Sequence, residues 1–166
     1  MKEKKNELDI LLPELKEIYS SNEFQQEAEN LQGIKEIKSF DKRMLSKVSK
    51  GDTIYILGSS KDAAESLEGY FVDWQKRRIK KGIKLKILYT NDAKEFAVKR
   101  AKLKLTNVRI LPKQITTPVA IDIAKDLVGT FVFGQNPFCF SIKNQKIAEN
   151  YKNYFELLWK ISKPLN

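Results

Sequence analysis

This sequence of 166 residues contains no histidine, and that absence excludes several kinds of catalytic chemistry. A histidine general base, a Ser-His-Asp triad, a Cys-His pair and a His-ligated zinc site all need the missing imidazole. The single cysteine, Cys139, also excludes an internal disulfide and a thiolate metal site. Because Cys139 lies within an apolar run, we expect a buried core thiol. The sequence therefore predicts neither a metal nor a cofactor.

Long apolar runs are missing as well. No stretch approaches the roughly twenty consecutive apolar residues that cross a membrane. The opening MKEKKNELD has no apolar segment after its charges, so it does not have the pattern of a secretory signal. With 42% hydrophobic residues, the chain has enough apolar material for one globular domain with a sizeable core. We expect a cytoplasmic protein without a membrane partner.

Positive charge exceeds negative charge along the chain. The 31 Lys and Arg residues outnumber the 21 Asp and Glu residues, which gives a net charge of +10. Such an excess favours acidic partners, for example nucleic acid or phosphorylated ligands. The alternative is a lysine-rich surface that is simply solvated.

Helical and strand-like patterns alternate through the middle of the chain. The order that the periodicity predicts is a helix from Gly33 to Lys50, a strand TIYIL, a helix from Lys61 or Asp62 to Lys81, a strand KLKILY, a helix after Asn91, and a strand TNVRIL. The preceding polar stretch, SSNEFQQEAENLQG, is expected to be irregular, apart from a short edge strand near Phe24. Alternation of helix and strand is typical of parallel strands in an α/β layer.

The block from Val119 to Ile161 breaks this alternation. Three strand-like runs, VAIDI, VGTFVF and FCFSI, are joined by short links, which favours antiparallel neighbours. An amphipathic helix follows. Its apolar residues, which can cover one side of the sheet, are Ile147, Ala148, Tyr151, Tyr154, Phe155, Leu158 and Ile161. The predicted fold class is α/β, with residues 23–166 as one domain whose mixed parallel and antiparallel sheet is flanked by helices.

Residues 1–22 form a predicted helical arm ahead of this domain. Its apolar stripe at helical spacing consists of Leu8, Leu11, Leu12, Leu15, Ile18 and Tyr19. The stripe either docks on the main domain or pairs with its copy in a second subunit. The heptad-like spacing favours pairing, and hence a homodimer.

Ligands of mixed α/β sheets bind beyond the carboxyl ends of parallel strands. Small or polar residues follow the strands that end near Leu57 and Tyr89, although Ser60 and Asn91 are also suitable helix N-caps. Arg78 continues an aromatic stripe, which suits either a ligand anion or a structural salt bridge. Asp122 faces either a cleft or solvent. The candidate ligand-binding residues are Ser59, Ser60, Trp74, Arg78, Tyr89, Asn91, Arg109, Asp122, Gln135 and Asn136.

Two segments are rich in positive charge and are candidates for nucleic-acid binding. KRRIKKGIKLK, residues 76–86, contains no acidic residue, and KRAKLK occupies residues 99–104. Neither is interleaved with exposed aromatic residues, so solvated helix ends are the alternative. The candidate nucleic-acid contacts are Lys76, Arg77, Lys80, Lys81, Lys84, Lys99, Arg100 and Lys102.

Several stretches together resemble one known family. GIKEI, RIKKGIKLKILY, VRILP and IAENYKNYFELLWK are similar to the C-terminal regulatory domain of TrmB-like archaeal transcription regulators, whose fold is similar to phospholipase D. LLPEL resembles the linker helix that follows the winged-helix DNA-binding domain of those proteins and helps to form the dimer. The resemblance spans residues 8–162.

The resemblance implies a phospholipase D-like scaffold without its catalyst. Phospholipase D enzymes need a His-x-Lys motif on the strand that begins here near Val119, where this sequence has TTPVAID. Gly134-Gln135-Asn136 is similar to the Gly-Ser-x-Asn run that follows the motif, with glutamine in place of serine. No winged helix fits ahead of Leu8, so the chain is either a piece of a longer regulator or a stand-alone module.

The leading functional hypothesis is therefore a non-catalytic effector-sensing and dimerisation domain. It would form a homodimer, bind an unknown small-molecule effector and contact DNA only through a winged-helix domain that is absent from this chain. Direct nucleic-acid binding through residues 76–86 and 99–104 is the alternative. An enzyme that uses Asp122, Tyr89 and Arg78 is a third hypothesis, but no constellation of residues supports a reaction.

Overall fold

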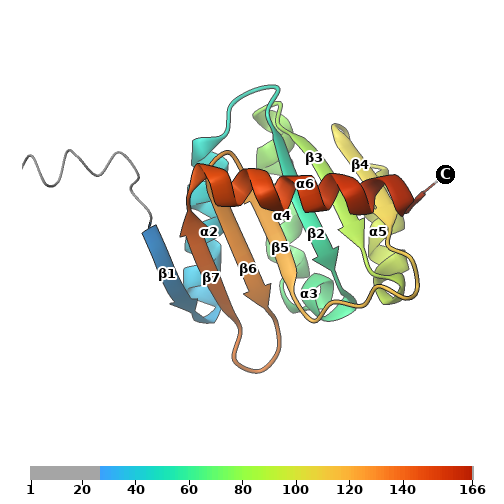
Figure 1. The fold of residues 1–166 in the computed structure, drawn as a ribbon, viewed down its shortest axis with the longest axis horizontal. Coiled ribbons are helices and arrows are strands. Elements are labelled where there is room, and N and C mark those ends of the chain that lie inside the picture. Colours follow the sequence, from blue (N-terminus) through green and yellow to red (C-terminus); the bar gives the residue numbers. More distant parts are fainter. Residues whose placement is uncertain (1–26, 166) are drawn as a thin grey trace, which may run out of the picture.

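A computed structural model describes residues 27–165 as a mixed sheet with helices on both faces (Figure 1). The predicted arm, residues 1–22, lies outside the described residues. In chain order the elements are β1 (Glu27–Gln32), α2 (Gly33–Lys47), β2 (Thr53–Ser59), α3 (Lys61–Ser66), α4 (Glu68–Lys80), β3 (Lys84–Tyr89), the short 3₁₀ helix η1 (Asn91–Ala93), α5 (Lys94–Ala101), β4 (Thr106–Ile110), β5 (Ala120–Ala124), β6 (Leu127–Val132), β7 (Phe138–Lys143), α6 (Gln145–Ile161) and β8 (Lys163–Pro164).

The sheet has eight strands in the order β1-β7-β6-β5-β2-β3-β4-β8. β2, β3 and β4 pair in parallel, with helices between them, and every other pair is antiparallel. The mixed parallel and antiparallel sheet predicted from the sequence is therefore confirmed. None of the helices in residues 27–165 has both the length and the apolar character that crossing a bilayer requires.

Strand alternation divides the core into two layers. On β5, Ala120 and Ala124 join the layer formed with α2, α4 and α5, whereas Ile123 joins the layer beneath α6. Figure 1 shows α6 crossing one face of the sheet, with the other helices behind it. Each face thus buries its own apolar residues, and Asp122 shares the face of Ala120 and Ala124.

The helix predicted from Lys61 or Asp62 to Lys81 is in fact two helices. Leu67 leaves the helical conformation (φ −138°, ψ 30°) and separates α3 from α4. The Leu67 side chain is buried in the core layer formed with α2, α4 and α5. The apolar area that it buries there stabilises the non-helical conformation at this residue. The break allows α3 and α4 to follow the sheet in different directions while both pack against it.

The edges of the sheet were predicted only in part. The segment expected to be irregular, apart from a short edge strand near Phe24, contains the edge strand β1 at Glu27–Gln32, and Phe24 itself lies outside the described residues. The residues of β1 are mostly exposed and therefore lack the apolar alternation of a half-buried strand. β8 consists of only two residues that pair with β4, so its sequence carries no strand pattern. Both errors concern edge strands, which have the weakest burial signal.

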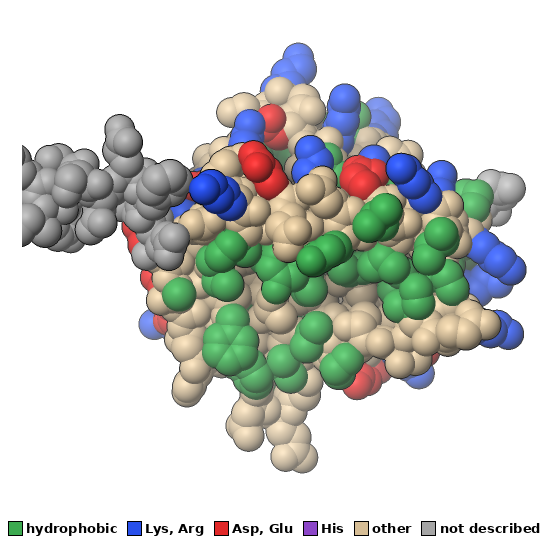
Figure 2. All heavy atoms as spheres, viewed as in Figure 1, with side chains coloured by type: hydrophobic (Ala, Val, Ile, Leu, Met, Phe, Trp, Pro, Cys, Tyr) green, Lys and Arg blue, Asp and Glu red, His purple; other side chains and the backbone are tan. Residues whose placement is uncertain are grey.

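α6 covers the sheet with a narrower stripe than the sequence predicts. Ala148 and Phe155 are buried, but Tyr154 and Ile161 remain 52% and 60% exposed. The helix contacts β2, β5 and β6, so residues on its flanks extend beyond the sheet surface. Figure 2 shows the resulting row of apolar side chains along α6, with further apolar side chains on the sheet face beside it. Leu157, on the same helix, is as exposed as Ile161.

Arg78 is fully buried and joins α4 to the two parallel strands beside it. Its guanidinium donates to the carbonyls of Ile83 (2.6 Å) and Leu105 (3.1 Å), and to the hydroxyl of Thr106 (2.6 Å). Leu105 has a positive φ of 57°, which non-glycine residues seldom adopt, and its carbonyl also accepts from the backbone N–H of Leu85. Burial lowers the pKa of Arg78 to about 10, so the group stays protonated at neutral pH.

Replacing Arg78 with methionine should destabilise the fold strongly. The Arg78→Met variant leaves buried carbonyl acceptors without donors, and we expect a loss of roughly 3 kcal/mol or more in the free energy of unfolding. Lys80→Met, at an exposed position of the same helix, should change it by less than about 0.5 kcal/mol. Urea denaturation of both variants measures the difference, and equal stabilities would contradict a structural role for Arg78.

Candidate ligand-binding site

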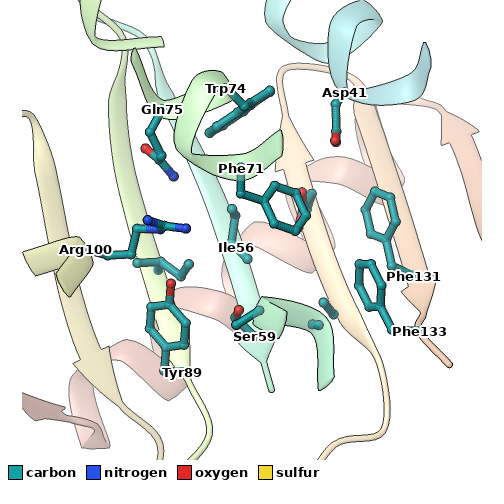
Figure 3. Close-up of a pocket in the computed structure, with 15 residues that line it drawn as sticks. Asp41, Ile56, Ser59, Phe71, Trp74, Gln75, Tyr89, Arg100, Phe131 and Phe133 are labelled. Atoms are coloured by element: carbon teal, nitrogen blue, oxygen red, sulfur yellow. The ribbon is translucent and has the colours of Figure 1, made fainter. Parts of the chain in front are cut away.

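A cavity of about 50 Å³ lies between the sheet and the layer formed by α2, α3, α4 and α5, and we call it the central cavity (Figure 3). Since one water needs roughly 10–15 Å³ on this measure, the space is large enough for a small molecule. Its apolar lining residues are Ile56, Ala63, Ala64, Phe71, Trp74, Ile87, Ala120, Phe131 and Phe133. Its polar lining residues are Asp41, Ser59, Gln75, Tyr89, Arg100 and Asp122.

A β-bulge turns Ser59 into the cavity. The register between β2 and β3 shifts between Leu57 and Ser59, and Gly58 between them has φ +80°. Leu57 packs in the layer beneath α6, so regular alternation would direct Ser59 to that same layer. A side chain at Gly58 would lie 2.5 Å from Cγ2 of Thr117 and 2.8 Å from the carbonyl oxygen of Val119. Glycine is therefore required there by both conformation and space.

Asp41 on α2 presents a buried carboxyl group to the cavity. The residue is 3% exposed, and its Oδ2 has no hydrogen-bond partner among residues 27–165. Burial raises the pKa of Asp41 to about 7, against the smaller opposing effects of a hydrogen bond with Tyr70 and of the Arg77 charge. This carboxyl group therefore holds its proton to a much higher pH than an exposed aspartate does.

Asp122 on β5 is the second acidic group of the cavity. It lies opposite Gly129 of β6, where a side chain would collide with the ring of Phe40 at 2.4 Å. Although it is in the middle of the sheet, Asp122 keeps some accessible surface, as do the cavity residues Phe71 and Phe133. Burial, followed by the charge of Asp41, raises the pKa of Asp122 well above its usual value.

Arg100 and Tyr89 form the polar wall at the other end of the cavity. Arg100 donates to Glu68 at 2.8 Å, and its side chain is 8% exposed, so its charge is already paired. Burial raises the pKa of Tyr89 to about 12, so its hydroxyl remains a neutral hydrogen-bonding group. Figure 3 shows Arg100 and Tyr89 across the cavity from Asp41, Phe131 and Phe133.

Trp74 contributes an unpartnered donor and an aromatic surface. It is 3% exposed, and its Nε1 has no acceptor among residues 27–165. In Figure 3, Phe71 lies beneath Trp74, and Phe131 and Phe133 form the opposite wall. These last two rings are stacked with centroids 6.0 Å apart. Unsatisfied buried polar atoms are uncommon in native proteins, so the donor of Trp74 and the acceptor of Asp41 both indicate a place for a bound molecule.

The structure distributes the predicted ligand-binding residues over several places. Ser59, Trp74, Tyr89 and Asp122 line the central cavity. Arg78 and Arg109 make structural contacts, the latter with the carbonyl of Trp159 at 2.6 Å beneath α6. Gln135 and Asn136 are exposed in the link between β6 and β7.

Ser60 and Asn91 line a second hollow, of about 290 Å³, at the carboxyl ends of the parallel strands. The Ser60 side chain caps α3 by accepting from the backbone N–H of Ala63, and the Asn91 amide donates to the carbonyl of Leu111. Lys113 adds a positive charge to the rim. Each of these two polar side chains thus has a structural partner. The interpretation of Ser60 as a helix N-cap is confirmed, whereas that of Asn91 is wrong, because Asn91 lies inside η1 and Thr90 precedes it as the N-cap.

Sequence reasoning missed Asp41, Gln75 and Arg100 as parts of one cavity. A signal for Asp41 does exist, because it lies four residues after buried Ile37 and therefore on the core face of α2. An acidic residue within an apolar helical stripe indicates either a paired charge or a binding site. The other two residues come together only through tertiary packing.

The comparisons with known proteins concern the fold. No family profile matches this sequence, and no curated protein matches it. Among solved structures, TrmBL2, described as an archaeal chromatin protein with a novel mode of DNA binding, superposes with a TM-score of 0.59 at 18% identity. That alignment covers 99% of this chain and 66% of the TrmBL2 chain.

Two further solved structures have a similar fold. NucT from Helicobacter pylori has a TM-score of 0.63 at 12% identity, and the alignment covers 85% of this chain and 100% of NucT. Nuc from Salmonella typhimurium, a phospholipase D family member, has a TM-score of 0.57 at 14% identity, with 86% of this chain and 99% of Nuc covered. The predicted resemblance to TrmB-like and phospholipase D-like proteins is therefore confirmed at the level of the fold.

The buried carboxyl group of Asp41 should make stability depend on pH. Between the unfolded pKa near 3.8 and the folded pKa of about 7, the folded state holds a proton that the unfolded state has released. The free energy of unfolding should consequently fall as pH rises through this window, by roughly 2–3 kcal/mol between pH 5 and pH 8. Urea denaturation at about pH 5 and about pH 8 measures the fall, which the Asp41→Asn variant should reduce without removing, because the buried carboxyl group of Asp122 adds a fall of its own.

Asp52→Asn is the control, because Asp52 has the opposite linkage. The pKa of Asp52 is lowered, chiefly by the hydrogen bond from Lys125. Its small contribution to the free energy of unfolding is therefore lost as pH falls rather than as pH rises. Parallel pH profiles for the wild type and Asp41→Asn would contradict the raised pKa of Asp41.

Proposed function

We propose that this chain is a non-catalytic sensing domain that binds a small-molecule effector in the central cavity. It relays binding to DNA-binding domains elsewhere in a transcription regulator and acts as a homodimer. The observation that carries the proposal is the central cavity itself, where Asp41 and Trp74 present buried polar atoms without partners among residues 27–165. The similar fold of TrmBL2, an archaeal chromatin protein, supports a role beside DNA.

The residues on β5 support a function without phosphodiester cleavage. β5 is the strand to which the family resemblance assigns the His-x-Lys motif, and its cavity-facing residues are Ala120 and Asp122. Alanine has no nucleophile, and an aspartate repels the phosphate that a lysine would hold. The whole sequence contains no histidine, which supports the proposal that the cavity serves ligand binding rather than phosphodiester cleavage.

Chain connectivity gives a route from the cavity toward residues 1–26. α2, which carries Asp41, follows β1 directly at Gly33, and β1 pairs along its whole length with β7. A ligand that contacts Asp41 therefore acts on the element next to β1, through which the predicted arm is attached. A ligand can shift the arm only if it binds one arrangement of the protein more tightly than another. We propose that the two arrangements differ in the position of α2 relative to the sheet.

Filling the cavity should remove ligand binding without removing any charge. In a thermal-shift screen of pooled metabolites, at least one pool should raise the Tm of the wild type, because a ligand of the folded state stabilises it. Ala63→Leu places a larger side chain at the cavity wall and should abolish that rise. Sedimentation velocity of the full chain, with and without the active pool, should show a dimer in both samples.

Ser66→Leu is the matched control, since Ser66 is exposed on the same helix. It should keep the ligand-induced rise in Tm. If Ala63→Leu shows the same ligand-induced rise in Tm as the wild type, the ligand does not bind in the central cavity. If the chain is strictly monomeric at high concentration, the homodimer part of the proposal is wrong.

Direct nucleic-acid binding is the second candidate, favoured by the meeting of the two basic segments. Arg78 donates to the carbonyl of Lys104 (3.4 Å), which brings the end of α5 beside the end of α4. Exposed lysines therefore share the edge of the sheet at the amino ends of the parallel strands, and we call this the basic edge. Its residues are Lys80, Lys84, Lys102 and Lys104. Figure 2 shows Lys and Arg side chains along this upper edge of the molecule.

Two of the predicted nucleic-acid contacts do not support this candidate. Arg100 is 7% exposed and paired with Glu68, and the Lys81 ammonium donates to the carbonyl of Leu45. Lys76 pairs with Asp73 in solvent, while Lys99 lies over the ring of Phe96. A phosphate backbone at the basic edge would therefore be held mainly by Lys80, Lys84 and Lys102.

A triple substitution tests the basic edge. If Lys80, Lys84 and Lys102 contact phosphates, replacing all three by glutamine should weaken binding to a short duplex and reduce the slope of log affinity against log salt by about 0.9 per lost contact. Fluorescence anisotropy across a salt series measures both effects. A triple variant at Lys94, Lys113 and Lys160 removes the same charge from other exposed positions. Equal losses in the two variants, or no binding at low salt, would contradict the candidate.

A further inference from the structure

The central cavity contains two acidic side chains, Asp41 and Asp122, whose negative charge on ionisation would not be compensated by a neighbouring cation within residues 27–165. Asp41 and Asp122 are close enough for the charge of one to raise the pKa of the other, and both lack an ion-pair partner among the described residues. Ionising either carboxyl group inside the empty cavity costs free energy, because the charge is removed from water. A positively charged group between the two would offset that cost.

We infer that the central cavity binds a small cationic amine whose ammonium group lies against Asp41 and Asp122. This inference rests on the sensing role proposed above and specifies the class of effector. Oδ2 of Asp41 is a buried acceptor without a donor, which an N–H of the ammonium would supply. Nε1 of Trp74 is a buried donor without an acceptor, so an amine that also carries a hydroxyl or carbonyl oxygen would satisfy both atoms.

The aromatic walls favour the same class of ligand. Phe71, Trp74, Phe131 and Phe133 line the cavity and enclose the side on which Asp41 lies, as Figure 3 shows. The faces of such rings attract a cation, most strongly where water is excluded. An aromatic enclosure combined with carboxylates is suited to an ammonium group with a short apolar body.

The positive groups near the cavity are already engaged by other side chains. Arg100 is paired with Glu68, while Arg43 donates to Glu29 at 2.6 Å and to Ser141 at 2.8 Å. Arg77 lies over the ring of Tyr70, and its charge offsets only a small part of the effect of burial on Asp41. The remaining titratable groups that face this region, Tyr70, Tyr89 and Cys139, are neutral because burial raises the pKa of each.

An anionic ligand fits this arrangement poorly. It would meet Asp41 and Asp122 as like charges, and Arg100 could bind it only by leaving Glu68. A neutral polyol could use the polar atoms but would leave the charge of the two carboxyl groups uncompensated. These two classes are therefore the competing outcomes of the test.

The test compares matched probes on the full chain by thermal shift and calorimetry. Propylamine, propanol and propionate have similar bodies and differ in charge, and ethanolamine with ethylene glycol adds the acceptor oxygen. Only the two amines should raise the Tm, with ethanolamine ahead of propylamine if its oxygen reaches Nε1 of Trp74. Asp122→Asn and Asp41→Asn should each raise the Kd for ethanolamine about tenfold or more. Asp73→Asn, which removes the same charge from an exposed position on α4, should not.

Proton release is a second readout that needs no variant. Because amine binding favours the ionised carboxyl groups, affinity should rise between about pH 6 and about pH 8, with net proton release at the lower pH. Calorimetry in two anionic buffers of different ionisation enthalpy measures that release, and amine buffers are avoided because they would compete. Release of no proton, or an unchanged affinity across this range, would overturn the inference.

The remaining outcomes separate this inference from the proposed function. If propanol, ethylene glycol or propionate stabilises the chain as well as the amines do, and Ala63→Leu removes the effect, the cavity senses another ligand class and the inference is overturned. If both Asp→Asn variants keep the full amine response, the inference is likewise overturned. If neither the amines nor any metabolite pool changes the Tm, the inference and the sensing role fail together.

Discussion

The burial of one charged side chain, Arg78, holds α4 against the parallel strands of the sheet. Its guanidinium contacts the carbonyls of Ile83 and Leu105, which belong to the connections that lead into β3 and β4. Its Nε donates to Gln75, a residue of the cavity wall. One side chain thus fixes the distance between α4 and the parallel strands, and any change in that distance would be felt both in the central cavity and at the basic edge. Burying a guanidinium is costly unless every donor finds an acceptor, so this contact tolerates little variation.

The central cavity exists because the sheet surface beneath it is not filled by large side chains. Ala120 on β5 and Ala63 and Ala64 on α3 leave space that larger residues would occupy, and the bulge at Gly58 turns a small polar residue toward the same space. The chain also places two acidic groups there, which lowers the stability of the unliganded fold at neutral pH. Such local conflict with good packing is expected at binding sites, where affinity for a ligand compensates for what the empty site loses.

The sequence was sufficient for the repeating parts of the fold and insufficient for the site. Apolar strand-like runs predicted β2 to β7, and the helices or short links between these runs predicted which strands pair in parallel and which in antiparallel. The resemblance to a phospholipase D-like domain implied the same fold. The break at Leu67, the edge strand β1 and the structural role of Arg78 depend on contacts between segments far apart in the chain. The same holds for the cavity, since Asp41 and Asp122 are separated by many residues and meet only because α2 packs over β6. From the sequence, Asp122 could face either a cleft or solvent, and only tertiary packing shows that it lies near Asp41 in the central cavity.

The two edges of the sheet affect how copies of the protein can associate. β1 presents Glu27 and Glu29 along one edge, and both residues are exposed. At the other edge β8 is only two residues long and includes Pro164, which has no backbone N–H to donate. Charge at one edge and an interrupted ladder at the other oppose the addition of a strand from a neighbouring chain, which is the usual start of fibrous aggregation. Within residues 27–165 a further strand is thus disfavoured at both edges of the sheet, whereas the outer side of α6 keeps Leu157 and Ile161 exposed.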